Sequence, residues 1–338
     1  MAVSDHLKLV CSNTDSPPPG DAPVLSHTPA EAQPSGMEPA LGGAAVVSEL
    51  LAALASPDLD RRASAARQLR QLRDPAAVPG LIHALGDDNA LVRRIAASAL
   101  GSIGDRQAIP ALVSALRDPL IPVQRAACAA LAQIGDPGAL LGLIQALEDP
   151  SPYVRGAAAA ALGTLGDRRA APRLIVALRD PESGVRCQAA AALGRIGEAW
   201  ATPYLLEALR DPAAQVRSLA AGALAQIGEA AAPALIDALR SPSLVVRRSA
   251  AWALGKIGSQ EAIPALLAAL SDAEWPVRQA AALALGAVGS RSKHKQVRRA
   301  IAAALKRSLT DTAGIAGGPH GSQRVCDAAL QALAQLEE

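Results

Sequence analysis

Residues Val185 to Gly197 read V-R-C-Q-A-A-A-A-L-G-R-I-G, and near-copies of this stretch recur along most of the chain. A Val-Arg pair opens copies at residues 92, 154, 185, 216, 246 and 277, a Val-Gln pair opens one at 123, and an Arg-Arg pair opens a weaker one at 61. Successive copies start 31 residues apart, with a single step of 30. A fixed period of this length is typical of stacked supersecondary units. The sequence therefore predicts a repeat fold.

Each repeat contains two helical patterns, which we name helix A and helix B. Helix A is typified by residues 108–116, where Leu and Ile recur at three- and four-residue spacing behind a proline near the start. We expect it to stop at an Asp-Pro dipeptide such as Asp118-Pro119. Helix B follows and ends at an Ile-Gly dipeptide such as Ile196-Gly197, because Gly can close a helix. With helices of about 11 to 14 residues, the pattern predicts an all-α fold, an α-solenoid of about nine HEAT-like two-helix repeats.

The chain divides into three expected parts. Residues 1–42 form a disordered Pro-rich tail, because they bury too little apolar surface to offset the entropy of ordering; the tail is either a solubilising leader or a docking motif. Residues 43–289 hold eight regular repeats. Residues 290–338 hold a divergent C-terminal capping repeat, with helix A at 296–309, helix B at 324–336 and a long Gly-rich loop at 311–323 that serves capping or binding.

Composition excludes several classes of protein. Half of the 338 residues are apolar but Phe is absent, so the core must be built from Ala, Leu, Ile and Val. The formal charge of +2 gives no global reason to expect nucleic acid as a partner. The start lacks a secretory apolar core and no uninterrupted apolar segment of about 18 residues exists, so we expect a cytoplasmic protein with no membrane span. The cysteines suit a reducing compartment because they are widely spaced, without a CxxC motif; they are Cys11, Cys128, Cys187 and Cys326.

An Asp and an Arg recur six residues apart across the turn from helix A to helix B. One Asp can cap the amides of helix B while accepting the Arg guanidinium from its own unit or the next. Because the pair recurs irrespective of any single site, we interpret it as a structural ladder. The ladder residues are Asp87, Arg93, Asp149, Arg155, Asp180, Arg186, Asp211, Arg217, Asp272 and Arg278.

Positions two, six and ten after the opening Val of helix B are expected to face the inner curve of the solenoid. The copy at 246–258 places Trp252 between Arg248 and Lys256 on this face. Such a groove suits a flat anionic ligand or a protein helix, although Trp252 can instead simply fill the groove wall. Cys187 is either an accidental exposed thiol or a transient attachment point. The predicted ligand- or partner-binding groove comprises Arg94, Arg125, Cys187, Arg195, Arg248, Trp252 and Lys256.

A basic patch follows the regular repeats. It is read as a solvated terminal cap, as a site for an acidic protein partner or as a nucleic-acid site, the last disfavoured by the low net charge. Its predicted members are Lys293, Lys295, Arg298 and Arg299. No GxGxxG, GxxxxGK[ST], HExxH or GxSxG motif occurs in a plausible setting, so the catalytic residues are unknown. We expect no metal site, because the five histidines are scattered and none precedes a Glu.

The proline of helix A, the Asp-Pro stop and the pattern V-R-x-x-A-A-x-A-L-G-x-I-G together closely resemble the HEAT-like repeats named for phycobilisome lyases. That superfamily includes E/F-type bilin lyases, phycobilisome-degradation factors and protein scaffolds. The resemblance implies a solenoid that handles a linear tetrapyrrole (bilin) on a phycobiliprotein, with a phycobiliprotein subunit or a second lyase subunit as partner. Arg195, Arg248 and Lys256 would pair with the bilin propionates and Trp252 would stack on the pyrroles. The alternative is a non-catalytic scaffold or adaptor that binds a partner helix.

Overall fold

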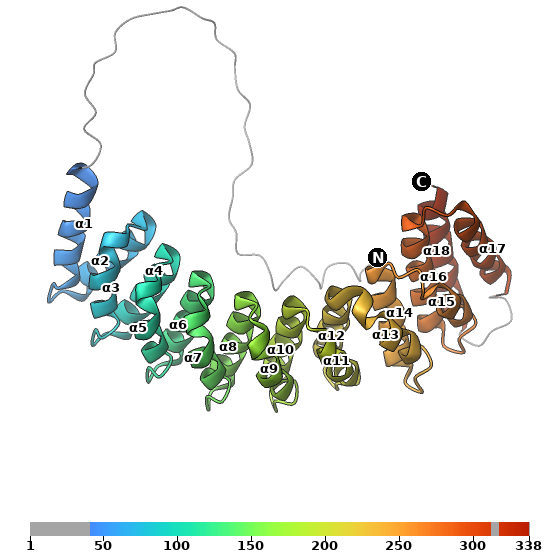
Figure 1. Ribbon diagram of the computed structural model, residues 1–338, viewed down its shortest axis with the longest axis horizontal. Coiled ribbons are helices and arrows are strands. Elements are labelled where there is room, and N and C mark those ends of the chain that lie inside the picture. The colour runs from blue at the N-terminus through green and yellow to red at the C-terminus, as the bar shows by residue number, and fades with distance from the viewer. Residues whose placement is uncertain (1–40, 312–317, 338) are drawn as a thin grey trace, which may run out of the picture. The chain divides into compact units, whose positions relative to one another are not determined.

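The computed structural model describes residues 41–311 and 318–337, and every regular element in those ranges is a helix. The α-solenoid expected from the 31-residue period is confirmed (Figure 1). The expected Pro-rich tail lies outside the described residues up to residue 40, and the first helix begins at Leu41.

Helices A and B alternate, so that odd-numbered helices are A and even-numbered helices are B. The A helices are α1 (Leu41–Leu54), α3 (Val78–Ala84), α5 (Ile109–Ala115), α7 (Leu140–Ala146), α9 (Ala171–Ala177), α11 (Thr202–Ala208), α13 (Ala232–Ala238), α15 (Ile263–Ala269) and α17 (Lys295–Asp311). The B helices are α2 (Leu59–Leu72), α4 (Ala90–Ile103), α6 (Ile121–Ile134), α8 (Pro152–Leu165), α10 (Ser183–Ile196), α12 (Ala214–Ile227), α14 (Leu244–Ile257), α16 (Trp275–Arg291) and α18 (Gly318–Glu337).

The A helices from α3 to α15 are shorter than the sequence predicted, whereas α1 has the predicted length. In α5 the α-helical part spans only seven residues, and a 3-10 turn at Arg106–Ala108 precedes it. Asp105 caps that turn by accepting the amide of Gln107 at 2.8 Å. The helix ends at Ala115, before the Asp-Pro dipeptide, because the next amides bond three residues back in tighter turns. The predicted stop is therefore placed a few residues too late.

The B helices from α4 to α14 end as the sequence predicted, on a glycine, whereas α2 ends before Arg73, with φ of 53°, and α16 continues past Gly289 to Arg291. Gly197 closes α10 with φ of 74° and donates its amide to the carbonyl of Leu193, a left-handed cap that a side chain would strain. Gly228 departs from this geometry with ψ of −146°, and a 3-10 turn follows directly at Gly228–Ala231. This departure falls in the single 30-residue step of the repeat.

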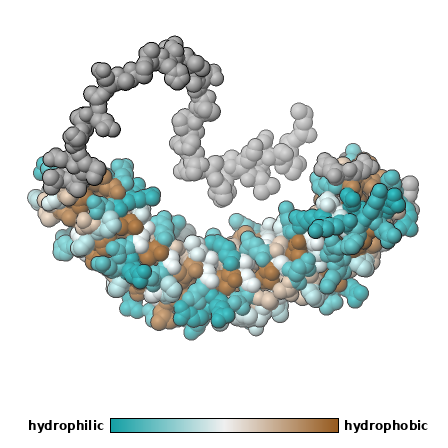
Figure 2. Space-filling model, turned by 45° about the horizontal axis from the view of Figure 1, so that its top comes forward, coloured by the Kyte–Doolittle hydropathy of each residue, from teal (hydrophilic) through white to brown (hydrophobic). Residues whose placement is uncertain are grey.

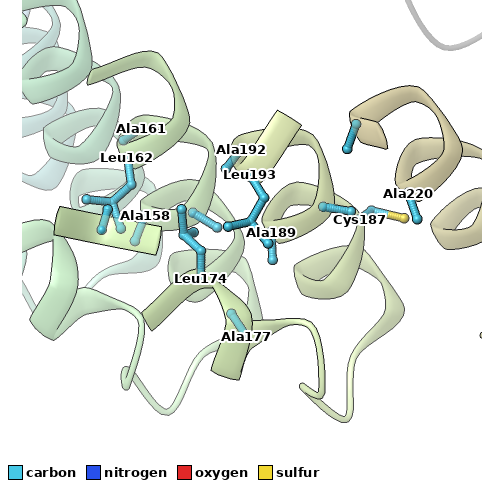
Figure 3. Packing of buried hydrophobic residues seen from close by; sticks show 14 of the residues in the cluster. Ala158, Ala161, Leu162, Leu174, Ala177, Cys187, Ala189, Ala192, Leu193 and Ala220 are labelled. Atoms are coloured by element: carbon cyan, nitrogen blue, oxygen red, sulfur yellow. The ribbon is translucent and has the colours of Figure 1, made fainter. Parts of the chain in front are cut away.

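The core lies between the layers of A and B helices and is continuous along the stack (Figure 3). Leu174 of α9 and Leu193 of α10 are fully buried, as is Leu162 of the preceding B helix. Burying each such Leu contributes about 1.5–3 kcal/mol. Small Ala side chains fill the space between neighbouring B helices, so these helices pack closely without aromatic residues.

Glycine sets the distance between most neighbouring B helices. A Cβ added at Gly163 of α8 would lie 2.6 Å from Ala192 Cα of α10, and one at Gly194 would lie 2.7 Å from Ala223 Cα of α12. The backbones therefore approach to a distance that only glycine permits. Ala132 of α6 and Ala225 of α12 occupy the equivalent sequence position in two repeats. At the α6–α8 and α12–α14 interfaces the two helix backbones consequently do not approach each other as closely as glycine allows.

The C-terminal pair differs from the sequence prediction. Helix α17 spans Lys295–Asp311, close to the expected 296–309, but α18 begins at Gly318 and not at residue 324. The second half of the expected 311–323 loop is thus helical, because the Gly and Pro residues there occupy the first turn of a helix, where they are tolerated. Residues 312–317 lie outside the described ranges.

One stretch of the described residues, Ala214–Ala238, is long and apolar enough by composition to cross a membrane. It is not one uninterrupted α-helix, because the 3-10 turn at Gly228–Ala231 separates α12 from α13. Its apolar side chains pack in the solenoid core, which accounts for its composition.

Candidate ligand groove and its supporting ladder

The Asp–Arg ladder joins neighbouring repeats at the start of each B helix. Arg186 of α10 binds Asp211 of the following unit through Nε–Oδ2 at 2.6 Å and Nη2–Oδ1 at 2.9 Å. Its Nη1 donates to the backbone carbonyl of Asp180 in its own unit at 2.8 Å. Asp211 therefore pairs with the arginine of the preceding unit, which corrects the expectation that it accepts from its own unit or the next. Equivalent ion pairs are Arg62–Asp87, Arg93–Asp118, Arg155–Asp180 and Arg247–Asp272.

Two of the predicted ladder arginines have no carboxylate partner in the described residues. Arg217 donates Nη1 to the carbonyl of Asp211, but Ser241 stands where the next carboxylate would be. Arg278 is 2% exposed and donates only to the carbonyls of Asp272 and Ala273. Asp149 accepts a 3.3 Å hydrogen bond from the Gln124 amide instead of an ion pair. The ladder is thus weakened after α6 and after α12, where alanine also replaces the close-approach glycine.

A hollow with apolar and cationic walls lies on the B-helix face between α12, α14, α16 and α18, and we name it the C-terminal groove. Its cavity volume is about 560 Å³, within the range of small-molecule sites. Apolar and neutral surface lies between hydrophilic residues along the visible face of the stacked helices (Figure 2). The side chains that give the groove its chemistry are Arg217, Ser218, Arg248, Trp252, Lys256, Leu283, Arg291 and Gln335.

The charged side chains of this groove are all cationic. Trp252 is 43% exposed, and the Lys256 ammonium lies 5.6 Å from its ring centroid. Arg291 of α16 donates Nη1 to the carbonyl of Lys256 at 3.0 Å, so its guanidinium is held at the end of α14. Arg248 is exposed and makes no side-chain hydrogen bond within residues 41–311 and 318–337. No Asp or Glu of the described chain lines the groove, which therefore offers a flat aromatic surface in a positive field.

The other predicted groove residues do not join this site. Arg94 and Arg125 line a separate hollow between α4, α6 and α8. Arg195 is exposed but donates Nη1 to the Thr164 hydroxyl at 3.1 Å, one repeat away from the C-terminal groove. Arg217 and Arg291 are groove residues that the sequence does not indicate, because Arg291 follows the last regular motif and Arg217 occupies a ladder position.

The expectation that Cys187 faces the groove is wrong. Its side chain is 4% exposed and lies beside Ala220 of α12 (Figure 3). Burial raises the pKa of its thiol, as does the charge of Asp211. At the same repeat position Arg94, Arg125 and Arg248 reach solvent, because a long side chain can extend past the neighbouring helix where a short one cannot. A buried thiol with a raised pKa is a poor attachment point.

The basic patch lies at the start of α17, apart from both hollows. Lys293, Lys295 and Arg299 are exposed, and Arg298 is half-buried. Among the described residues no group of three His, Cys, Asp or Glu side chains is arranged to hold a metal ion.

The chain belongs to the HEAT repeat family. The model of HEAT repeats matches residues 47–121, 78–141, 111–183, 140–225, 172–242, 202–286 and 232–316. This agrees with the HEAT-like repeat that the V-R…L-G-x-I-G motif resembles. No curated protein matches the chain.

Solved structures are similar to the chain at low sequence identity. The complex of CpcE and CpcF of phycocyanin lyase from Nostoc sp. PCC7120 is 26% identical over 93% of this chain and 100% of that chain, with a TM-score of 0.34. An engineered protein is 22% identical over 87% of this chain and 99% of that chain, with a TM-score of 0.46. A structure of Kap95p bound to RanGDP is 15% identical over 87% of this chain and 45% of that chain, with a TM-score of 0.59, and it shows a shared helical-repeat fold.

Proposed function

We propose that this HEAT-repeat chain is a binding solenoid that handles a bilin on a phycobiliprotein, with the C-terminal groove as the bilin site. The observation that carries the proposal is the exposed Trp252 ring, which lies between Arg248 and Lys256 in a groove without acidic side chains. A phycobiliprotein subunit or a second lyase subunit is the proposed protein partner. The resemblance of the repeat motif to E/F-type bilin lyases supports this choice of ligand.

The chemistry of a linear tetrapyrrole matches the groove. Its conjugated rings are flat, so they can stack on the indole of Trp252 and lie against Leu283. Its two propionates are carboxylates, which guanidinium groups bind in a bidentate manner. Arg248 and Arg291 approach from neighbouring helices, and Lys256 adds a third cation. In this role the groove binds and orients the pigment, and the solenoid presents it to the partner.

Absorption spectroscopy tests the bilin site directly. Phycocyanobilin is titrated into the full chain, into Trp252→Ala, and into Trp200→Ala as a control. Trp200 is 47% exposed in a 3-10 turn and does not line the groove, so the control removes an equally accessible indole. We expect a red-shifted complex for the wild type and the control, and about 5- to 150-fold weaker binding for Trp252→Ala, since one base-like stacking contact is worth about 1–3 kcal/mol. An unchanged spectrum on adding bilin to the wild type contradicts the proposal.

A protein-binding adaptor is the second candidate function. It is favoured by the small residues Ala221, Gly255, Ala284 and Ala287 of the same groove, which allow a partner helix to approach the B helices closely. Co-purification from a native extract separates the candidates: recovery of a phycobiliprotein subunit supports bilin handling, and recovery of a partner without bilin supports the adaptor. We also propose a cytoplasmic location, supported by the thiols of Cys128 and Cys187, which form no disulfide.

A further inference from the structure

Acidic side chains are absent from a long part of the B-helix layer. The B helices α4, α6, α8, α10, α12, α14 and α16 contain no Asp or Glu, although each contains at least one Arg. The acids of these repeats lie on the A helices and in the turns, where they cap 3-10 turns, as Asp105 does, or accept ladder arginines, as Asp211 does. The charges are therefore segregated, and the B-helix face carries a positive field.

The arginines of the two faces also differ in what they bind. On the A side, Arg173 and Arg179 pair with Glu148 and Glu207 at 3.2 and 3.0 Å. On the B-helix face, besides Arg248 of the C-terminal groove, four further arginines that line hollows have neither an ion pair nor a side-chain hydrogen bond to the described residues of the chain. They are Arg70, Arg73, Arg94 and Arg125. Guanidinium groups without a partner among residues 41–311 and 318–337 are available for a carboxylate of another molecule.

These four arginines surround one continuous hollow, which we name the N-terminal groove. Its first part, of about 620 Å³, lies between α2, α4 and α6 and is lined by Arg70 and Arg73. Its second part, of about 640 Å³, continues between α4, α6 and α8 and is lined by Arg94 and Arg125. The two parts share Ser98, Ala126, Ala129 and Gln133. Small side chains form the floor of the groove, and arginines form its rim.

The geometry points to a binding site for an acidic segment of another protein in the N-terminal groove, with Asp and Glu carboxylates seated on Arg70, Arg73, Arg94 and Arg125. A single small anion could not engage cations contributed by α2, α4 and α6 along the whole hollow, whereas a polypeptide can. Ala126 and Ala129 let the backbone of such a segment lie close to the helices. This site is separate from the C-terminal groove and does not depend on the bilin proposal.

A protein partner fits this groove better than a nucleic acid. No aromatic side chain lines either part of the hollow, so unpaired bases would have no stacking surface. The hydroxyls of Ser98 and Ser102 donate to the carbonyls of Arg94 and Ser98 within α4, at 3.1 and 3.0 Å, and so are not free to donate to phosphate oxygens. Binding therefore rests on guanidinium–carboxylate pairs.

The test uses the full chain and a fluorescein-labelled peptide of twelve glutamates, with fluorescence anisotropy as readout in low salt. The variant is Arg94→Gln with Arg125→Gln. The matched control is Arg106→Gln with Arg240→Gln, which removes two exposed arginines that lie outside both grooves. We expect saturable binding to the wild type and the control, and at least about tenfold weaker binding to the groove variant, because each charged hydrogen bond is worth about 1.5–3 kcal/mol.

Two further measurements separate this site from the bilin site and a protein ligand from a nucleic acid. Trp252→Ala is expected to bind the peptide as the wild type does, which separates this site from the bilin site, and circular dichroism checks that each variant is folded. A labelled oligothymidylate of equal charge is expected to bind more weakly than the peptide. Equal weakening by the groove and control variants, absence of saturation by the peptide, or tighter binding of the oligothymidylate each overturns the inference.

Discussion

Replacing Asp211 by alanine tests the ladder that holds adjacent repeats together. Asp211 accepts two hydrogen bonds from Arg186, at 2.6 and 2.9 Å, and one from the amide of Ala213 at 2.8 Å. Only 9% of the Asp211 side chain and 13% of the Arg186 side chain are exposed. The variant loses a turn-capping bond worth about 1 kcal/mol and leaves a partly buried guanidinium without its charged hydrogen bonds, worth about 1.5–3 kcal/mol. We expect a loss of about 2–4 kcal/mol in local stability.

The pH dependence of this loss follows from the pKa of Asp211. The hydrogen bond from Arg186 holds the pKa of the carboxyl below its usual value of 3.8, against the opposing effect of burial. Because the pKa is lower in the folded state, the stabilisation is fully present above 3.8 and disappears as the pH falls through the folded-state pKa. The difference between the wild type and Asp211→Ala is therefore expected at pH 7 and shrinks in strong acid.

Hydrogen exchange of the α10 and α12 amides is the appropriate assay, because long repeat arrays open locally and do not follow a two-state transition. Asp237→Ala serves as control, since Asp237 is exposed on α13. A double-mutant cycle with Arg186→Ala measures the coupling between the two side chains, expected at about 1–3 kcal/mol. Protection in Asp211→Ala equal to that in Asp237→Ala, or a coupling energy near zero, would refute the reasoning.

Three further predictions concern packing, ladder completion and the thiols. Ser241→Asp supplies the carboxylate that Arg217 lacks, so we expect about 1 kcal/mol of added stability across the α12–α14 interface by hydrogen exchange; no gain would show that the repeat step of 30 residues keeps the two side chains apart. Gly163→Ala places a Cβ 2.6 Å from Ala192 Cα and should cost about 1–3 kcal/mol, whereas Gly222→Ala, with open space around it, should not; equal effects would contradict the close approach. Burial raises the pKa of Cys128 from 9.0 to about 12, so at pH 8 its reaction with a thiol reagent is expected to be about three orders of magnitude slower than in the unfolded chain; rapid labelling of folded protein would contradict its burial.

The sequence predicts the fold well because particular residues of the repeat mark where its helices begin and end. The opening Val and the closing Gly mark both ends of a B helix, so α10 is located to within about two residues. The A helices are predicted too long, because their apolar spacing continues through the 3-10 turns on either side of the seven-residue α-helix. The spacing of apolar residues in the sequence does not distinguish a 3-10 turn from an α-helix.

The candidate site is only partly readable from sequence, because it depends on distances between repeats. Trp252 stands out as a large residue where other copies have small ones, and the structure places it in a groove with Arg248 and Lys256. The partner of each ladder carboxylate lies 25 residues earlier in the chain, a relation that follows from the offset of stacked repeats and not from any motif. Cys187 was misplaced for a similar reason, since the neighbouring helix α12 covers it.

The most direct test of the account isolates the fluorescence of the groove indole. A chain with Trp200→Phe and Trp275→Phe keeps Trp252 as its only tryptophan, since the sequence contains three. Titration with phycocyanobilin should then quench the emission in a saturable manner, and the quenching should weaken at least about tenfold when Arg248 and Lys256 are both replaced by glutamine. Emission that falls only in proportion to added pigment, with no saturation and no effect of the two replacements, would contradict the assignment of the C-terminal groove as the ligand site.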